Sequence, residues 1–220
     1  MLSRDEYLAA WSRWHGGTDP AASRLLRGWL TAAYTLARPM SGVPPVVATA
    51  FGLLIAAAAV APAAAGGRWL VVAGVLVGLS GLLDSLDGAL AIGTGRASRR
   101  GYVLDSAVDR LTEAAFAAAL WTAGAPGWLA AGYGALCWLP DYLRARAGQA
   151  GVAETGDISV WERPTRVAMT GMTLVGAGVV AGGGAGLVAG VVTGGTVAGA
   201  LLGVVAVAQL GRAIRRALPD

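Results

Sequence analysis

Long apolar stretches dominate this chain of 220 residues and limit what it can fold into. A helix that crosses the roughly 30 Å of membrane hydrocarbon needs about 20 mostly apolar residues. Stretches of about that length occur at 43–64, 69–93, 102–123, 127–146, 165–184 and 186–210. Because 55% of the residues are hydrophobic and only 14% are charged, the composition is typical of a membrane protein. The sequence therefore predicts an all-α polytopic membrane protein with six transmembrane helices, or five if the glycines near 183 form no turn.

The arginines indicate how these helices are oriented. All seventeen basic residues are arginine, and most lie before residue 43, at 96–100, at 144–166 and at the C-terminal end. By the positive-inside rule these segments and both termini are cytoplasmic, in an integral protein of the cytoplasmic (inner) membrane. The pI of about 9.8 therefore reflects topology and contact with anionic membrane lipid, and no nucleic-acid partner is expected.

The N-terminal segment is more polar than the stretches that follow. Residues 1–40 are expected to form a cytoplasmic juxtamembrane amphipathic segment whose tryptophans, such as Trp14 and Trp29, lie in the headgroup layer beside arginines. An ordinary packed pair of helices is an equally good interpretation. The six-helix membrane domain is expected at 41–212, with a short cytoplasmic tail at 213–220.

The last apolar stretch contains two rows of glycines at a spacing of four residues: Gly186, Gly190 and Gly194, then Gly195, Gly199 and Gly203. Small residues at this spacing let neighbouring helices approach closely. Tight packing inside the helix bundle is favoured over an interface between two copies of the chain.

Four aspartates interrupt two of the apolar stretches. Asp84 and Asp87 lie in SGLLDSLDGALA, and Asp105 and Asp109 lie in GYVLDSAVDRLT. The spacings of three and four residues place each pair on one face of a helix, one turn apart. Carboxylates in apolar surroundings are costly and usually functional, and four of them in one place need cations or protons to offset their repulsion. The two helix faces could therefore hold cations between them.

Three interpretations of these aspartates compete. Arg110 and the loop arginines could neutralise them in a structural salt-bridge cluster, or the acids could carry protons or cations in a transporter. A divalent metal site is favoured, because oxygen ligands without nearby His or Cys suit Mg²⁺, Mn²⁺ or Ca²⁺ better than zinc. Gly88, Ala91 and Gly101 support this interpretation, since small residues leave the helix surface clear for a ligand such as a pyrophosphate.

The same residues resemble a known signature. The pattern D-x2-D-G-x2-A followed by G-x3-D-x3-D, which runs from Asp84 to Asp109, is similar to the signature of the CDP-alcohol phosphotransferase family. One position differs, because Ile92 stands where the family has an arginine that helps to hold the nucleotide side of the substrate. Arg96, one turn further along the same predicted helix face, is expected to reach back and take the place of that arginine.

The resemblance implies a CDP-alcohol phosphatidyltransferase of phospholipid biosynthesis, which transfers a phosphatidyl group from CDP-diacylglycerol to an alcohol and releases CMP. Two divalent cations, Mg²⁺ or Mn²⁺, are expected as cofactors, and a homodimer in the membrane is expected as the assembly. The metal ligands would be the four aspartates, and Asp109 would also be the catalytic base for the acceptor hydroxyl. The nucleotide site would be lined by small and polar residues of the signature region: Asp84, Gly88, Ala91, Arg96, Gly101 and Asp105.

A second region resembles family members that make phosphatidylinositol phosphate and related anionic phospholipids. The segments DYLRAR (141–146) and ERPTR (162–166) look like their Y-x-R-A-R-A and E-R-P-x-R motifs. Positive-inside topology alone also accounts for arginines here. The resemblance favours a phosphorylated polyol as acceptor, such as inositol phosphate or glycerol 3-phosphate, with phosphatidylglycerol, the acceptor of a cardiolipin synthase, as the alternative. The residues expected to bind the acceptor phosphate are four arginines: Arg144, Arg146, Arg163 and Arg166.

Overall fold

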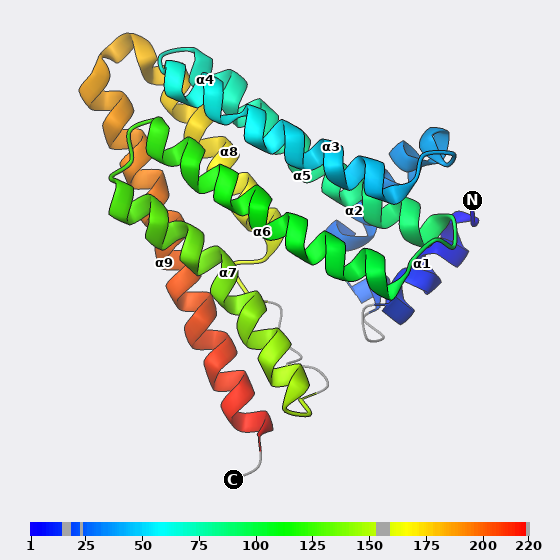
Figure 1. Ribbon diagram of the computed structural model, residues 1–220. Coiled ribbons are helices and arrows are strands. Elements are labelled where there is room, and N and C mark those ends of the chain that lie inside the picture. The colour runs from blue at the N-terminus through cyan, green and yellow to red at the C-terminus, as the bar shows by residue number, and fades with distance from the viewer. Residues whose placement is uncertain (15–18, 23, 153–158, 219–220) are drawn as a thin grey trace. The chain divides into compact units, whose positions relative to one another are not determined.

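The computed structural model describes residues 1–14, 19–22, 24–152 and 159–218, and the predicted all-α class is confirmed for these ranges (Figure 1). The helices are α1 (Arg4–Trp14), α2 (Arg24–Ala37), α3 (Pro45–Ala58), α4 (Val60–Ala65), α5 (Trp69–Gly93), α6 (Arg99–Thr122), α7 (Gly127–Gln149), α8 (Arg163–Val179) and α9 (Ala185–Ala217). Short 3-10 turns occupy Pro20–Ala22, Arg38–Met40 and Val180–Gly183.

In the described part of the chain, four helical segments are long and apolar enough to cross a membrane: Pro45–Ala65, Trp69–Gly93, Arg163–Gly183 and Ala185–Ala217. They coincide with four of the six predicted stretches. The other two predicted stretches form the single helices α6 and α7, in which charged residues interrupt the apolar sequence. The last two stretches are separate helices, because Gly184 ends the turn before α9 with a φ of 97°. By the length and composition of its helices, the chain is a polytopic membrane protein.

The chain forms two compact units. The first comprises Met1–Leu54 and Leu79–Asp109, and the second comprises Ile55–Gly78 and Arg110–Asp220. The four aspartates belong to the first unit, and the four arginines expected at the acceptor belong to the second. Each of these two charged sets therefore lies inside a single unit.

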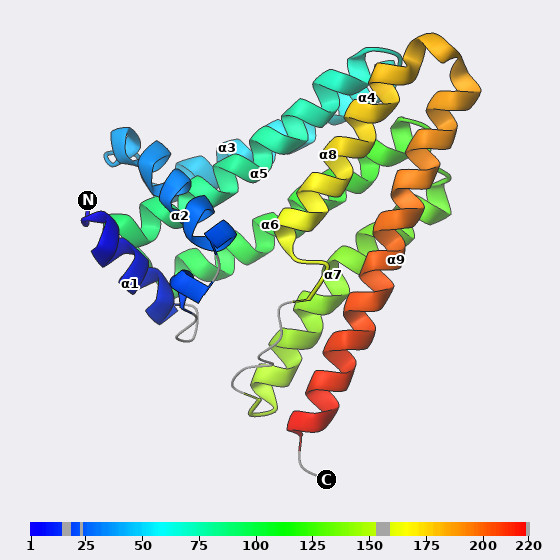
Figure 2. The same cartoon turned by 180° about the vertical axis from the view of Figure 1, so that it is seen from behind.

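In the first unit, α1 and α2 pack against the C-terminal half of α5, where Figure 2 also shows them. Tyr7 of α1 is only 1% exposed, and its ring centroid lies 5.3 Å from that of Tyr34 in α2. Both tyrosines share a core with Leu86 and Leu90 of α5. Burial raises the pKa of Tyr7 to about 12, so this side chain stays neutral at physiological pH.

The start of α1 is fixed by a capping box. The Ser3 backbone N–H donates to the Glu6 carboxylate at 2.8 Å, and the Glu6 N–H donates to the Ser3 hydroxyl at 3.4 Å. Hydrogen bonds from the Ser3 side chain and backbone lower the pKa of Glu6. The Leu2 N–H donates to the Gly93 carbonyl at 2.7 Å and ties this end of the chain to the end of α5. The packed pair of helices is thus present, and Trp29 of α2 stays exposed on its surface.

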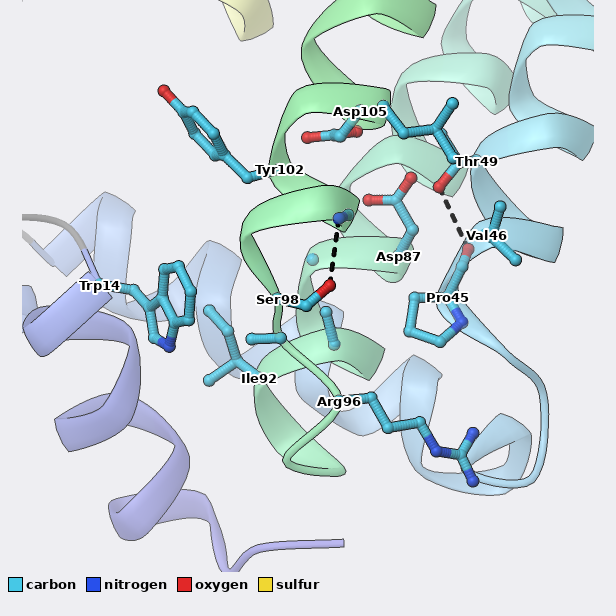
Figure 3. A pocket seen from close by; sticks show the side chains of 15 residues that line it. Trp14, Pro45, Val46, Thr49, Asp87, Ile92, Arg96, Ser98, Tyr102 and Asp105 are labelled. Atoms are coloured by element: carbon cyan, nitrogen blue, oxygen red, sulfur yellow. Dashed lines mark hydrogen bonds between the residues drawn. The ribbon is translucent and has the colours of Figure 1, made fainter.

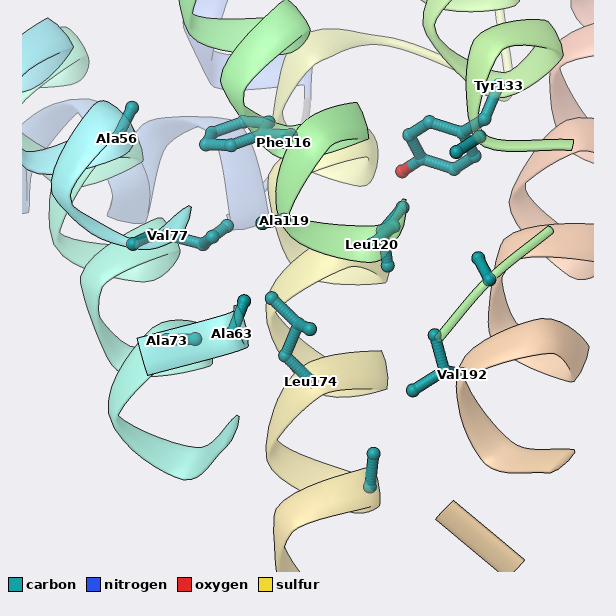
Figure 4. Packing of buried hydrophobic residues seen from close by; sticks show 14 of the residues in the cluster. Ala56, Ala63, Ala73, Val77, Phe116, Ala119, Leu120, Tyr133, Leu174 and Val192 are labelled. Atoms are coloured by element: carbon teal, nitrogen blue, oxygen red, sulfur yellow. The ribbon is translucent and has the colours of Figure 1, made fainter. Parts of the chain in front are cut away.

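In the second unit, α9 packs against α7 and α8 around small and apolar side chains. Figure 4 shows Phe116 and Leu120 of α6 in the cluster that also contains Leu174 of α8. The Tyr133 ring of α7 meets Trp161 edge to face, with the ring centroids 5.4 Å apart. These bulky rings take up the space that the many alanines and glycines leave open.

The two glycine rows of α9 have different surroundings. A Cβ atom added at Gly199 would lie 2.9 Å from Trp161, and one added at Gly203 would lie 2.8 Å from Leu136. Such distances are too short for real side chains, so this row packs inside the second unit, as the sequence predicts. The other row meets nothing within 4 Å of an added Cβ: Gly186, Gly190 and Gly194.

We expect Gly199→Ala to lower the free energy of unfolding by about 1–3 kcal/mol, because the new methyl group would overpack the contact with Tyr133 and Trp161. Gly190→Ala is the matched control on the same helix, and it should be neutral or stabilise by up to about 1 kcal/mol. Thermal and denaturant unfolding of both variants in one detergent measures the difference. Equal stability of the two variants would show that the row at Gly199 is not tightly packed.

Candidate functional site

The four aspartates come together on two helices of the first unit. Asp84 and Asp87 project from α5, and Asp105 and Asp109 project from the first turns of α6. One carboxylate oxygen from each of Asp84, Asp105 and Asp109 lies within 4.8 Å of the other two. Three partly buried carboxylates at this separation repel one another unless a cation lies between them. The predicted grouping of aspartates from two helix faces is therefore present.

Asp87 is the most buried of the four aspartates. Its side chain is 5% exposed, and its Oδ2 atom has no hydrogen-bond partner among the described residues. Figure 3 shows this carboxylate beside Thr49, whose hydroxyl donates to the Pro45 carbonyl at 3.1 Å. Burial of a carboxylate oxygen that accepts no hydrogen bond costs free energy. A bound divalent cation would offset this cost, because such cations prefer oxygen ligands. The donor set therefore fits Mg²⁺ or Mn²⁺ bound between α5 and α6.

A cavity of about 530 Å³ opens beside these aspartates within the first unit (Figure 3). Its walls come from the end of α1, the start of α3, the C-terminal half of α5, the loop at 94–98 and the start of α6. Asp87 and Asp105 line one part of it. This volume is in the range of sites that hold small organic ligands, so a ligand in the cavity can reach the carboxylate cluster.

Small residues shape the wall of this cavity, as the sequence predicts. A Cβ atom at Gly88 would meet nothing within 4 Å, so the glycine leaves the surface of α5 open there. At Gly101, an added Cβ would approach the Ser98 hydroxyl, which accepts the Gly101 N–H at 3.0 Å. Of the residues expected at the nucleotide, Asp84 belongs to the carboxylate cluster and does not line the cavity. The others line it: Gly88, Ala91, Arg96, Gly101 and Asp105.

The expected position of Arg96 on the face of the preceding helix is wrong. α5 ends at Gly93, and Gly95 adopts a left-handed φ of 68°. The Arg96 N–H then donates to the Ala91 carbonyl at 2.8 Å, which closes a Schellman turn. From this loop the Arg96 guanidinium donates to the Val43 carbonyl at 3.2 Å, and Figure 3 shows it pointing away from the aspartates. Arg96 therefore lines the cavity without occupying the place of the arginine that Ile92 replaces.

The arginines expected at the acceptor lie in the second unit and differ in their surroundings. Arg166 is 1% exposed and donates to Glu113 at 2.6 Å and to Asp141 at 2.7 Å. Arg144 forms ion pairs with Glu162 and with Asp141, the latter at 3.2 Å.

The other two arginines of this set differ in exposure. Arg146 is exposed and donates to Gln149 at 2.6 Å, while Arg163 begins α8 and is partly buried, with its Nε and Nη1 atoms inside the protein. Of the four arginines, only Arg146 is exposed.

Sequence reasoning missed the carboxylates of this network. Glu113 is 1% exposed inside α6, and Arg110 pairs with it at 3.3 Å and with Asp141 at 2.5 Å. A glutamate in the apolar run LTEAAFAAAL needs a buried partner, so Glu113 itself was a signal that could have been used. Its partner Arg166 lies more than 50 residues away in the chain, and no local pattern connects the two.

We expect Asp87→Asn to weaken the binding of Mn²⁺ by about tenfold or more, because a neutral amide replaces a buried carboxylate ligand. Titration of the purified protein in detergent, followed by the electron paramagnetic resonance of free Mn²⁺, measures the affinity. Asp5→Asn is the control, since Asp5 is an exposed aspartate of α1 that pairs with Arg4. An unchanged affinity in Asp87→Asn would remove this residue from the metal site.

Arg166→Gln should lower the free energy of unfolding by about 3–5 kcal/mol, because it leaves Glu113 and Asp141 without their buried cation. Arg146→Gln removes the same charge from an exposed position and should change it by no more than about 1 kcal/mol. Denaturant unfolding of both variants in detergent provides the comparison. A fully stable Arg166→Gln protein would argue against a structural role for the network.

Comparison with known proteins supports the match of motifs. The model of the CDP-alcohol phosphatidyltransferase family matches residues 29–208. A phosphatidylinositol phosphate synthase of Mycobacteroides abscessus is 31% identical over 183 residues, which cover 77% of this chain and 71% of that protein. An archaetidylinositol phosphate synthase of Aeropyrum pernix is 38% identical over 104 residues, or 46% of this chain and 54% of that protein.

A solved structure is similar over most of the chain. It is the phosphatidylinositol phosphate synthase of Mycobacterium tuberculosis with CDP-DAG bound. The similarity has a TM-score of 0.62 and 26% sequence identity, and it covers 83% of this chain and 92% of that one. Sequence and fold therefore point to the same group of proteins.

Proposed function

Since this chain belongs to the CDP-alcohol phosphatidyltransferase family, we propose that it transfers a phosphatidyl group from CDP-diacylglycerol to a phosphorylated polyol and releases CMP. The observation that carries this proposal is the cluster of Asp84, Asp105 and Asp109 around one point, with the buried Asp87 beside a cavity large enough for a nucleotide. The relatives named as phosphatidylinositol phosphate synthases support the choice of donor and of acceptor class.

The four aspartates are proposed to hold two divalent cations, Mg²⁺ or Mn²⁺. When bound, such cations neutralise the diphosphate and the negative charge that develops on the departing CMP. The chain's own contribution is the placement of four hard oxygen donors on α5 and α6, of which α5 is held by the core that it shares with α1 and α2. Gly88, Ala91 and Gly101 keep the adjacent wall free of large side chains, so that the nucleotide can approach the carboxylates.

Asp109 is proposed to accept the proton of the attacking hydroxyl. The acceptor oxygen then forms a bond to the phosphorus that carries the diacylglycerol, while the bond from that phosphorus to the CMP oxygen breaks. The proton ends on the Asp109 carboxylate, and the electron pair of the broken bond leaves with CMP. Asp109 is suited to this role because it is the last aspartate of the series and is only partly buried.

The acceptor is proposed to be a phosphorylated polyol, with inositol phosphate ranked before glycerol 3-phosphate. Four arginines of the second unit offer the charge that such a phosphate requires, and the carboxylates that pair with Arg144 and Arg166 hold those two guanidinium groups in place. Arg146 is exposed and Arg163 is partly buried, and both are proposed to meet the phosphate directly. If phosphatidylglycerol is the acceptor instead, the protein is a cardiolipin synthase, and its lipid product carries four acyl chains.

The position in the membrane is proposed from the same arginines. All six predicted stretches, including α6 and α7, would cross the cytoplasmic membrane, with both termini and the arginine-rich loops on the cytoplasmic side. A water-soluble acceptor would then meet a donor that stays in the lipid. A homodimer is proposed as the assembly, since small residues at four-residue spacing on α9 permit close contact between helices.

The proposal is tested by CMP release from labelled CDP-diacylglycerol in membranes, with a panel of acceptors scored by the mass of the lipid product. We expect product with inositol phosphate and a rate that falls by about 10²–10⁴-fold in Asp109→Asn. Measurement of CMP binding in the presence of Mn²⁺ separates the two proposed roles of Asp109. If Asp109 acts only as the base, Asp109→Asn should leave CMP binding unchanged, whereas the loss of a metal ligand should weaken it. Undiminished CMP release in Asp109→Asn would exclude the proposed base, and no CMP release with any acceptor in the unaltered protein would exclude the function.

A further inference from the structure

The cavity of the first unit has two chemically different parts. Asp87 and Asp105 provide negative charge in one part, where bound cations would attract a diphosphate. Trp14 and Ile92 line another part, and Figure 3 shows the Trp14 indole next to Ile92 and away from both carboxylates. A nucleotide has the same division, because its phosphates are charged and its base is a neutral planar ring.

The packing of α1 explains why Trp14 lies at the cavity. Tyr7, Ala10 and Trp14 are spaced at i, i+3 and i+7, so their side chains share one face of α1. Tyr7 and Ala10 are buried in the core of the first unit against α5, and the Leu2 N–H holds the start of the helix to the Gly93 carbonyl. The same face therefore carries Trp14 over the cavity wall.

Trp14 differs from its neighbours on this face in its exposure. Tyr7 is 1% exposed and Ala10 is 8% exposed, whereas Trp14 is 49% exposed. The indole lines the cavity, so part of its exposed surface is available to a ligand there. An indole face of this kind binds planar groups by stacking, and its interaction with a nucleic-acid base tolerates different base identities.

Ile92 gives this wall its neutral character. It is 8% exposed and belongs to the apolar core of the first unit. An arginine at this position would bring a cation to the cavity wall and attract a phosphate, whereas isoleucine offers only an apolar surface. Arg96 does not restore that charge next to Ile92, because its guanidinium is bonded to the Val43 carbonyl. A neutral ring therefore fits this part of the cavity better than a phosphate does.

We propose that Trp14, supported by Ile92, is the surface on which the cytosine base of CDP-diacylglycerol stacks, which makes it a binding residue for the base of the donor. This inference rests on the proposed function, because it assumes that the cavity holds the donor nucleotide. It assigns the base to the wall built by α1 and leaves the diphosphate to the aspartates of α5 and α6.

Trp29 is a matched control for the other role open to Trp14, which is to anchor the N-terminal helices in the lipid headgroup layer. Trp29 lies on α2, is 47% exposed and does not line the cavity. A function in the headgroup layer would be shared by the two tryptophans, which have almost the same exposure. A function in base stacking belongs to Trp14 alone.

The test compares CMP with ribose 5-phosphate, which lacks the base, by equilibrium binding to the purified protein in detergent with Mn²⁺. We expect Trp14→Leu to weaken CMP binding by about tenfold, to leave ribose 5-phosphate binding unchanged, and to raise the KM for CDP-diacylglycerol more than it lowers kcat. Trp14→Phe keeps an aromatic face and should retain most of the CMP affinity. Trp29→Leu should change the affinity for neither ligand.

Several outcomes would overturn this role of Trp14. Unchanged CMP affinity in Trp14→Leu would exclude stacking, and an equal loss for CMP and ribose 5-phosphate would point to damage of the whole site. An equal effect of Trp29→Leu would assign both tryptophans to the membrane surface. If Trp14→Leu does not fold, Trp14→Phe and Trp14→His provide the test. The CMP affinity of these variants should then fall in the order of the stacking area of their rings. Failure of the unaltered protein to bind CMP would instead reject the proposed function.

Discussion

Mutual repulsion between carboxylates is the constraint on which the first unit depends. Asp84, Asp105 and Asp109 approach one another closely, and Asp87 is buried beside them. The core of tyrosine, leucine and alanine side chains under α1 and α2 fixes the C-terminal half of α5, which carries Asp84 and Asp87. In addition, α1 provides part of the cavity wall through Trp14.

In the second unit, buried carboxylates are paired with arginines. Glu113, Asp141 and Glu162 are matched by Arg110, Arg144 and Arg166, so its carboxylates are offset by side chains of the same unit. A paired network of this kind has little affinity left for a metal ion, but it holds guanidinium groups in fixed directions. The chain thus separates a carboxylate cluster in the first unit from a network of paired arginines and carboxylates in the second unit.

Much of the fold could be predicted from the sequence because membrane helices are long and sharply bounded. The predicted stretch at 69–93 coincides with α5, since glycine and arginine stand on either side of its apolar run. The shared helix face of each aspartate pair could be predicted from spacing, because positions three or four apart lie on one face. The approach of the two pairs depends on the arrangement of α5 and α6, which spacing does not determine. The predicted position of Arg96 is wrong because helical spacing does not continue past Gly95, whose left-handed conformation ends the helix. The partners of Arg166 could not be predicted, since long-range ion pairs leave no local pattern.

The Schellman turn after α5 has a consequence for how this protein can change over evolution. Only residues 94–98 connect α5 to α6, and the turn at Gly95 is closed by two backbone hydrogen bonds, in which the Gly95 and Arg96 N–H groups donate to carbonyls of the last turn of α5. This short connection therefore limits how far the aspartate pair of α6 can shift relative to the aspartate pair of α5. Insertion or deletion of a single residue inside α6 before Asp105 would turn Asp105 and Asp109 by about 100° about the helix axis and carry them out of the cluster. A change of length is therefore far more damaging within α6 than a change of side chain on the exposed surface of the loop.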